Sequence, residues 1–281
     1  MGAIGYYNGK LGDLDTMSVP MLDRAFYFGD GCYEACLVRN GVAFGCDAHI
    51  DRFFSSLSLL EIPAPCDADA LKAVLAECIA AANEPAAVLY WQCSRGTDRR
   101  KHNFPAASVR PNLCVMVTPK KLPGAHDAVR LMTADDIRFS MCNVKTLNLL
   151  PNVLTNQRAT AQGLDGAIFV RDGFVTEGTH SNVHILKDGA LVTHPADQYI
   201  LKGVTRGKLI AICRRFGVKV SERPFTRAEL FTADEVLISS SAAHIRRVTE
   251  IDGRPVGGRE GKLLETLQTA YEEQFLKETT A

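Results

Sequence analysis

The stretch CNVKTLNLLPN, Cys142 to Asn152, places a single lysine inside an otherwise uncharged run. Val144 and Leu147 beside it are residue types that are usually buried, whereas the ammonium group of Lys145 favours water. The residues alone allow two interpretations. In the first, the alkyl chain packs against apolar neighbours while the ammonium group reaches solvent. In the second, Lys145 is a Schiff-base lysine, held partly out of water so that its neutral amine can attack a carbonyl.

Length and charge restrict the functions that fit. The chain has 281 residues, enough for two ordinary domains. Lys plus Arg and Asp plus Glu number 32 each, so no overall field attracts nucleic acid or an anionic membrane. The first twenty residues lack the apolar region of a secretion signal, and no later run approaches the roughly 18 apolar residues of a membrane span. We expect a soluble, cytoplasmic protein whose partners are small molecules, with no nucleic acid and no membrane.

The cysteines and histidines do not indicate a metal site. Nine cysteines are spread along the chain without a C-x-x-C pair, which fits neither a zinc ribbon nor a disulfide framework. His180 and His184 lie in a strand-like segment, without the helical geometry of a zinc protease. We therefore expect no metal, and cysteines that behave as small buried hydrophobic residues.

The hydrophobic pattern predicts an α+β fold of two mixed α and β domains. The stretch PKKLPGAHDAV, residues 119–129, holds two prolines and a glycine and is the predicted linker. We expect a smaller N-terminal α+β domain over residues 1–120 and a larger C-terminal domain over residues 121–281. Apolar spacing and turn residues predict the elements. Expected helices cover 47–60, with Asp47 as N-cap, 67–83, 152–163 and 205–217, and expected strands cover 86–96, 111–119, 166–176, 182–194 and 234–241.

Five motifs, spread in order over nearly the whole chain, carry a family resemblance. They are DRAFYFGDGCYE at 23–34, HIDRF at 49–53, VKTLNLLPN at 144–152, VTEGTHSNV at 175–183 and HPADQYILKGVTR at 194–206. Together they closely resemble the fold type IV aminotransferases that use pyridoxal 5'-phosphate. The resemblance implies that the cofactor lies in the cleft between the domains, bound by the C-terminal domain, and that Lys145 holds it as an internal aldimine.

The same resemblance assigns the other cofactor contacts, and the chemistry of the cofactor supports them. Pyridoxal phosphate needs an anion near its pyridine nitrogen and donors for its phosphate. The resemblance implies that Glu177 is the anion and that Leu201 packs against the ring. It assigns the phosphate to Arg52, to Val204 and Thr205 at the start of a helix, and to the turn of Ser240 and Ser241.

The loop SRGTDRRKHNF, residues 94–104, concerns the substrate. Arg100 and His102 are two apart, so in an extended segment they point to the same side. A cluster of this kind is commonly a solvated surface; alternatively it binds a carboxylate, for which the arginine fork is suited. The run R-G-T-x-x-R-x-H is similar to the carboxylate-binding loop of D-amino-acid aminotransferases, which implies that Tyr33 is its third member.

These resemblances imply a ping-pong transamination through the Lys145 aldimine. A D-amino acid such as D-alanine gives its amino group to a 2-oxo acid, 2-oxoglutarate or pyruvate, and Lys145 moves the proton at Cα. They also imply a homodimer in which Arg100 and His102 reach the neighbouring active site. The alternatives are an aminodeoxychorismate lyase, a branched-chain L-amino-acid aminotransferase and a noncatalytic protein that binds the cofactor. The joint presence of Tyr33, Arg100 and His102 argues against the lyase and the branched-chain enzyme. Lys145 and Glu177, together with this carboxylate-binding set, argue against a noncatalytic protein.

Overall fold

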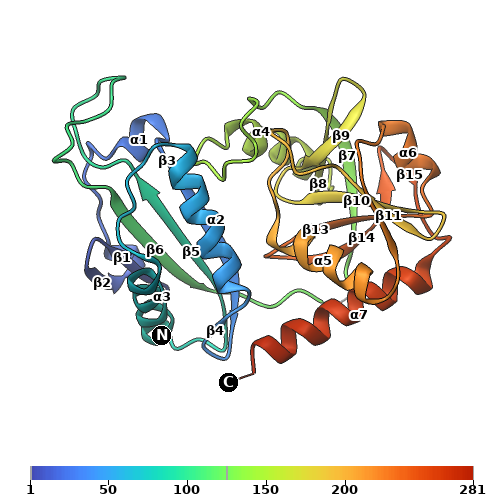
Figure 1. Cartoon of the computed structure of the whole chain (residues 1–281), viewed down its shortest axis with the longest axis horizontal. Helices are drawn as coiled ribbons and strands as arrows, with labels where there is room; N and C mark the ends of the chain where they lie inside the picture. The colour runs from blue at the N-terminus through green and yellow to red at the C-terminus, as the bar shows by residue number, and fades with distance from the viewer. Residues whose placement is uncertain (1, 125, 281) are drawn as a thin grey trace. The chain divides into compact units, whose positions relative to one another are not determined.

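The computed structural model describes residues 2–124 and 126–280, and the chain forms two compact units (Figure 1). The first unit holds Met1–Leu122, Val144–Asn148 and Leu276–Ala281. The second unit holds Pro123–Asn143 and Leu149–Phe275. Helices and strands occur in both, as expected for an α+β fold.

The first unit is built on an antiparallel sheet of six strands in the order β2-β1-β6-β5-β3-β4. Two long helices, α2 and α3, pack on this sheet. The strands are β1 (Ile4–Tyr7), β2 (Lys10–Asp13), β3 (Gly31–Arg39), β4 (Val42–Ala43), β5 (Ala86–Ser94) and β6 (Asn112–Pro119), and the helices are η1 (Leu14–Thr16), α1 (Arg24–Phe28), α2 (Cys46–Leu59) and α3 (Ala68–Ala82).

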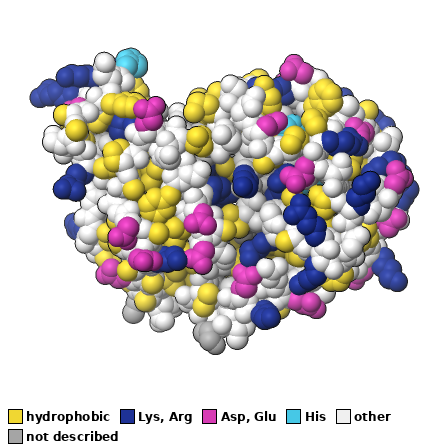
Figure 2. Space-filling view, viewed as in Figure 1, with side chains coloured by type: hydrophobic (Ala, Val, Ile, Leu, Met, Phe, Trp, Pro, Cys, Tyr) yellow, Lys and Arg dark blue, Asp and Glu magenta, His cyan; other side chains and the backbone are white. Residues whose placement is uncertain are grey.

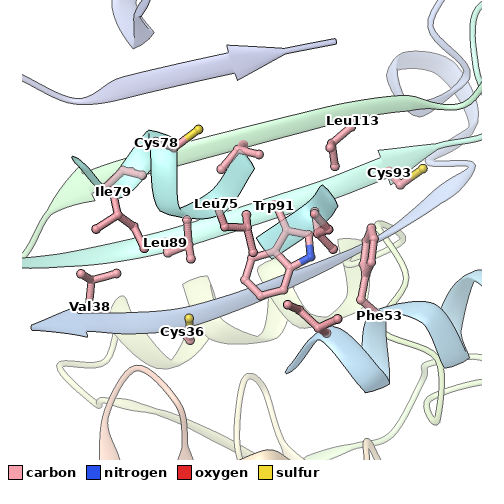
Figure 3. Packing of buried hydrophobic residues seen from close by; sticks show 14 of the residues in the cluster. Cys36, Val38, Phe53, Leu75, Cys78, Ile79, Leu89, Trp91, Cys93 and Leu113 are labelled. Carbon is pink, nitrogen blue, oxygen red and sulfur yellow. The ribbon is translucent and has the colours of Figure 1, made fainter. Parts of the chain in front are cut away.

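One face of this sheet and the two long helices enclose a hydrophobic core (Figure 3). Because side chains alternate along a strand, every second residue of β5 points into the core, and Leu89, Trp91 and Cys93 are fully buried. Phe53 of α2 meets Trp91 edge-on, with ring centroids 6.1 Å apart. Tyr90 lies between Leu89 and Trp91 in β5 and therefore points to the opposite face of the sheet. It is only half-buried, so this face is available for function.

The cysteines contribute to this core as small hydrophobic residues. Figure 3 shows Cys36, Cys78 and Cys93 among the packed side chains. All nine cysteines are free thiols, and six of them are buried. Burial raises the pKa of Cys32 and of Cys78 to about 12, so both thiols are protonated and poorly reactive at neutral pH.

The second unit contains a nine-stranded sheet in the order β12-β11-β10-β13-β14-β7-β8-β9, with β15 paired to β14. An additional pairing of β9 with β10 closes six of these strands into a ring around an apolar core. The strands are β7 (Ala128–Asp135), β8 (Gly166–Arg171), β9 (Phe174–Gly178), β10 (Asn182–Lys187), β11 (Ala190–Thr193), β12 (Lys219–Glu222), β13 (Glu235–Ser240), β14 (His244–Ile251) and β15 (Arg254–Pro255), and the helices are α4 (Leu150–Thr160), α5 (Val204–Arg215), α6 (Arg227–Thr232) and α7 (Gly261–Glu278).

The structure refines two expectations. The helix expected from Asp47 begins at Cys46, because Gly45 precedes it in a left-handed conformation, φ 65°, that favours glycine. The compact units also differ from a division at residue 120, since Val144–Asn148, with Lys145, and Leu276–Ala281 belong to the first unit. Thr146 forms a β-bridge with Cys32, which ties the first of these segments to β3.

No helix among the described residues is long and apolar enough to cross a membrane. Basic and acidic side chains both occur across the face of the molecule in Figure 2.

Candidate active site

Lys145 lies at the edge of strand β3. The Tyr33 N–H donates to the Lys145 carbonyl at 2.9 Å, and the Leu147 N–H donates to the Gly31 carbonyl at 3.1 Å. These bonds hold an irregular segment beside the strand. Val144 and Thr146 are buried whereas Lys145 is half-buried, so its backbone is fixed while its side chain reaches the protein surface.

The Lys145 amine lies over an aromatic ring. Its Nζ is 4.2 Å from the ring centroid of Tyr33, within the range of a cation–π contact. Tyr33 stacks on Tyr90, with ring centroids 5.4 Å apart. The structure thus brings together two predicted site residues, Lys145 and Tyr33, on the half-buried side of the sheet.

Arg100 and His102 lie in the irregular loop between β5 and β6. Both side chains are exposed, and basic and histidine side chains gather at this tip of the first unit in Figure 2. The Arg100 guanidinium carbon is 5.0 Å from the ring centroid of Phe28, and the His102 ring centroid is 5.3 Å from it. The pair is therefore together, but no hydrogen bond, ion pair or ring contact in the described parts of the chain joins it to Tyr33.

Arg52 lies on α2 and is paired with a buried carboxylate. Its Nε and Nη2 donate to the two Glu34 carboxylate oxygens at 2.6 and 2.7 Å, and His49 Nδ1 lies 2.7 Å from Glu34 Oε2. Burial by itself would raise the pKa of Glu34, but the hydrogen bonds and charge of Arg52, with His49, lower it to about 2. The Arg52 guanidinium is thereby held in one orientation, with 12% of the side chain exposed.

Glu177, at the end of β9 in the second unit, is a buried carboxylate with several donors. Arg138 Nη1 donates to one of its oxygens. The Leu201 N–H and Asn182 Nδ2 donate to the other at 2.9 and 3.2 Å. These contacts place the predicted residues Glu177 and Leu201 together and fix the direction of the carboxylate.

A second acid supports Arg138. Arg138 Nη2 lies 2.8 Å from Asp136 Oδ2. Burial would raise the pKa of Asp136, but its hydrogen bonds to Arg138 and the charge of this arginine lower the value to about 2. The same neighbours, Asp136 and Glu177, outweigh the burial of Arg138 and raise its pKa. Neither Asp136 nor Arg138 was predicted, because the DDIRF stretch carries no motif of its own.

The start of helix α5 lies next to the Glu177 carboxylate in the fold. Asn182 also donates from Nδ2 to the Leu201 carbonyl at 2.9 Å, and a Cβ at Gly203 would approach Asn182 Oδ1 to 2.0 Å. Only a glycine permits this approach, and it gives α5 no side-chain cap. The N–H groups of the first turn, which begins at Val204 and Thr205, thus have no partner within the helix and could serve an anion.

Ser240 adds a hydroxyl group to the same region. It ends β13, whose Ser239 pairs with Asn182 of β10. The Ser240 Oγ is buried and has no hydrogen-bond partner in the described residues. A buried donor of this kind is costly unless a ligand uses it. Ser241 follows in the turn to β14 and is half-buried.

These features fit the chemistry of pyridoxal phosphate. The cofactor needs a lysine for its aldehyde, a carboxylate for its ring nitrogen and donors for its phosphate. The first unit offers a half-buried lysine. The second offers a fixed carboxylate, an uncapped helix start and the buried hydroxyl of Ser240. Among the described residues, no cluster of three or more His, Cys, Asp or Glu side chains could hold a metal ion.

Sequence comparison agrees with this chemistry. Residues 31–251, more than half of the chain, match the family described as Amino-transferase class IV. A D-alanine aminotransferase of Bacillus licheniformis is 38% identical over 276 residues, which cover 97% of both chains. A D-alanine aminotransferase of Staphylococcus haemolyticus is 35% identical over 271 residues, which cover 95% of both chains.

Solved structures share the fold. The Escherichia coli branched-chain amino acid aminotransferase has a TM-score of 0.90 and 25% identity, covering 100% of this chain and 97% of the other. A branched-chain aminotransferase of Thermoproteus uzoniensis has a TM-score of 0.89 and 24% identity, covering 99% and 96%. The predicted fold type IV architecture is confirmed.

The predictions of an aminotransferase and of pyridoxal 5'-phosphate as its cofactor are also confirmed, since class IV aminotransferases depend on this cofactor. The identity to relatives over nearly the full length and the matched residues lead to one conclusion: the chain belongs to the class IV aminotransferases.

Proposed function

We propose that this enzyme transfers the amino group of a D-amino acid, such as D-alanine, to a 2-oxo acid, either 2-oxoglutarate or pyruvate. The observation that carries the substrate class is the exposed pair of Arg100 and His102 on the ring of Phe28. An arginine fork beside a second donor suits a carboxylate. The identity to D-alanine aminotransferases over nearly the full length supports the same substrate.

Each unit has its own task in this proposal. Bound pyridoxal phosphate supplies the electron sink for the electron pair released at the substrate Cα. Lys145 of the first unit is its covalent anchor and, once released, takes the proton from Cα and returns it. The ring of Tyr33 beside Nζ restricts where this amine moves. Its hydroxyl serves as the third member of the carboxylate-binding set.

In the second unit, Glu177 would hold the proton on the pyridine nitrogen of the cofactor. Its fixed donors, among them the Leu201 N–H, keep the carboxylate oriented, and the Leu201 side chain would pack against the ring. Val204 and Thr205 would bind the phosphate through the start of α5, with the hydroxyls of Ser240 and Ser241. Arg52 of the first unit, oriented by Glu34, would add a guanidinium donor for the phosphate.

A second copy of the chain completes the enzyme in this proposal. Exposed apolar side chains lie beside the loop that carries Arg100 and His102, among them Met21 at 78%, Phe26 at 73% and Phe104 at 57% exposure. Large apolar groups around a charged pair are typical of an interface. We infer a homodimer in which the partner receives Arg100 and His102. Balanced charge, 32 basic and 32 acidic residues, supports a cytoplasmic enzyme that acts on small molecules.

A half-reaction tests the substrate class. The holoenzyme is mixed with D-alanine or with L-alanine, without any 2-oxo acid, and the absorption spectrum of the cofactor is followed. We expect conversion of the cofactor to its amino form with D-alanine only. Conversion with L-alanine only would overturn the D-amino acid proposal and favour a branched-chain type of enzyme. No conversion with either would overturn the alanine transaminase as a whole.

A further inference from the structure

The short helix α1 holds the backbone of the loop that presents Arg100 and His102. The Tyr27 hydroxyl donates to the Asp98 carbonyl at 2.6 Å. Arg24 Nη1 donates to the Lys101 carbonyl at 2.9 Å and to the Asn103 carbonyl at 3.3 Å. The two acceptors of Arg24 flank His102 in the chain, so one guanidinium group fixes the backbone on both sides of it.

Arg24 is itself held rigidly. Its side chain is buried, with 3% exposure, and its Nε donates to Asp30 Oδ2 at 2.7 Å. The helix that carries it is short but capped at both ends, by the Asp23 side chain and by Gly29 in a left-handed conformation. Arg24 therefore acts as a fixed support and is not a flexible surface group.

The ring of Phe28 arranges the side chains on this support. Its centroid lies 5.0 Å from the guanidinium carbon of Arg24, 5.0 Å from that of Arg100 and 5.3 Å from the His102 ring centroid. The guanidinium groups of Arg24 and Arg100 both lie near the Phe28 ring, and the π-system of this ring attracts both. Arg100 and His102 remain exposed while their backbone and one face are held.

Without the contacts of Arg24, Tyr27 and Phe28, little else would hold the loop in one conformation. The segment between β5 and β6 lacks regular structure apart from a single bridge at Thr97, and Arg99, Arg100 and Lys101 in succession repel one another. We propose that Arg24 is a positioning residue for substrate recognition, which through the loop backbone and Phe28 presents Arg100 and His102 as a preformed receptor for the amino acid carboxylate. This inference rests on the proposed function and adds the residues that set its specificity.

Kinetics of the holoenzyme test the inference. Replacement of Arg24 with Gln removes the donor that serves both carbonyls, and we expect the KM for D-alanine to rise about tenfold with kcat changed less than about twofold. Phe28→Leu keeps an apolar side chain but removes the ring, and is expected to act in the same direction. Arg39→Gln is the matched control, because the Arg39 guanidinium of β3 donates to the Thr279 carbonyl at 3.3 Å and lies outside the loop; its KM stays at the wild-type value.

A double variant separates positioning from general damage. If Arg24 acts through the receptor, then adding Arg24→Gln to Arg100→Leu lowers kcat/KM for D-alanine by clearly less than Arg24→Gln does alone, since one of the two groups that Arg24 presents is already absent. Fully multiplicative losses would overturn the inference. Trypsin supplies a readout apart from activity: cleavage after Arg99, Arg100 or Lys101 is expected to be faster in Arg24→Gln and unchanged in Arg39→Gln.

The outcomes distinguish this inference from the proposed function. If Arg100→Leu leaves the KM for D-alanine unchanged, the carboxylate receptor itself is refuted, and the positioning role with it. If Arg100→Leu raises the KM but neither Arg24→Gln nor Phe28→Leu does, only the positioning role is refuted. Should Arg24→Gln not fold, Arg24→Lys and Phe28→Leu decide the question, with wild-type kinetics in both counting against it.

Discussion

Lys145, which is half-buried, is the residue on which the proposed chemistry depends. Replacement with Ala removes both the covalent anchor and the proton carrier at Cα, so we expect kcat to fall by about 10³-fold or more. The contacts assigned to Glu177 and to the phosphate-binding groups remain, so the cofactor is expected to stay bound noncovalently. Mass spectrometry after borohydride reduction measures this: the wild type carries a covalent adduct and the variant does not.

The control for this prediction is Lys121→Ala, which removes an exposed lysine and is expected to keep both the adduct and turnover. A Lys145→Ala enzyme with near-normal turnover would remove this residue from the mechanism.

Single residues also show what sequence patterns reveal. Lys145 and Glu177 could be selected as candidates from the sequence because each lies in a recognisable motif and offers a group that the cofactor requires. Arg138 was not, because its role depends on Asp136 and Glu177 meeting in the folded second unit. Arg24 was missed for the same reason: its acceptors at Lys101 and Asn103 are more than 70 residues away in the chain.

Among the elements, strands β10, β11 and β13 are joined by one buried histidine. His184 Nδ1 lies 2.9 Å from Thr193 Oγ1, and Nε2 lies 2.8 Å from Ser239 Oγ. Burial, with a smaller effect of Arg206, lowers the pKa of His184 from 6.5 to about 3. The folded state therefore requires the neutral ring, whereas the unfolded chain gains a proton below about pH 6.5.

The sign of this shift gives a prediction about acid stability. The contribution of His184 is complete above about pH 6.5 and is lost as the pH falls toward 3, by on the order of 5 kcal/mol in total. Denaturant unfolding of the wild type and of His184→Gln from pH 7.5 to 4 measures it, and the variant is expected to lose less stability over this range. Equal pH dependence in both would contradict the prediction. His126→Gln, which replaces an exposed histidine of the same unit, serves as the control.

Most of the predicted elements are present because their periodicity is local. Residues 67–83 became α3 with Asp67 as its cap, and residues 205–217 became most of α5. The final helix α7 was not predicted, although Leu264, Leu267, Tyr271 and Phe275 have helical spacing and are buried. The closure of β9 onto β10 was beyond prediction, because strand pairing is decided by tertiary packing.

At the scale of the whole molecule, the exposure of Arg100 and His102 favours an active site that a second chain completes. The two groups proposed to bind a substrate carboxylate are presented to solvent beside exposed apolar side chains such as Phe26. In a homodimer these apolar groups become buried, and burial of such groups drives association. We expect light scattering to give twice the chain mass of 30.7 kDa. Phe26→Asp is expected to shift the protein toward the monomer, whereas Phe216→Asp, at an exposed position of the second unit, leaves it a dimer.

Mixed dimers test whether the partner supplies the carboxylate receptor. Lys145→Ala and Arg100→Leu are each nearly inactive with low concentrations of D-alanine, for different reasons. If Arg100 serves the neighbouring subunit, a mixed dimer contains one site with both an intact lysine and an intact arginine. Random exchange of equal amounts makes half of the dimers mixed, so about one quarter of the wild-type sites are restored. If Arg100 serves its own subunit, no site in the mixture is intact, and the absence of restored activity despite proven exchange would refute the shared site.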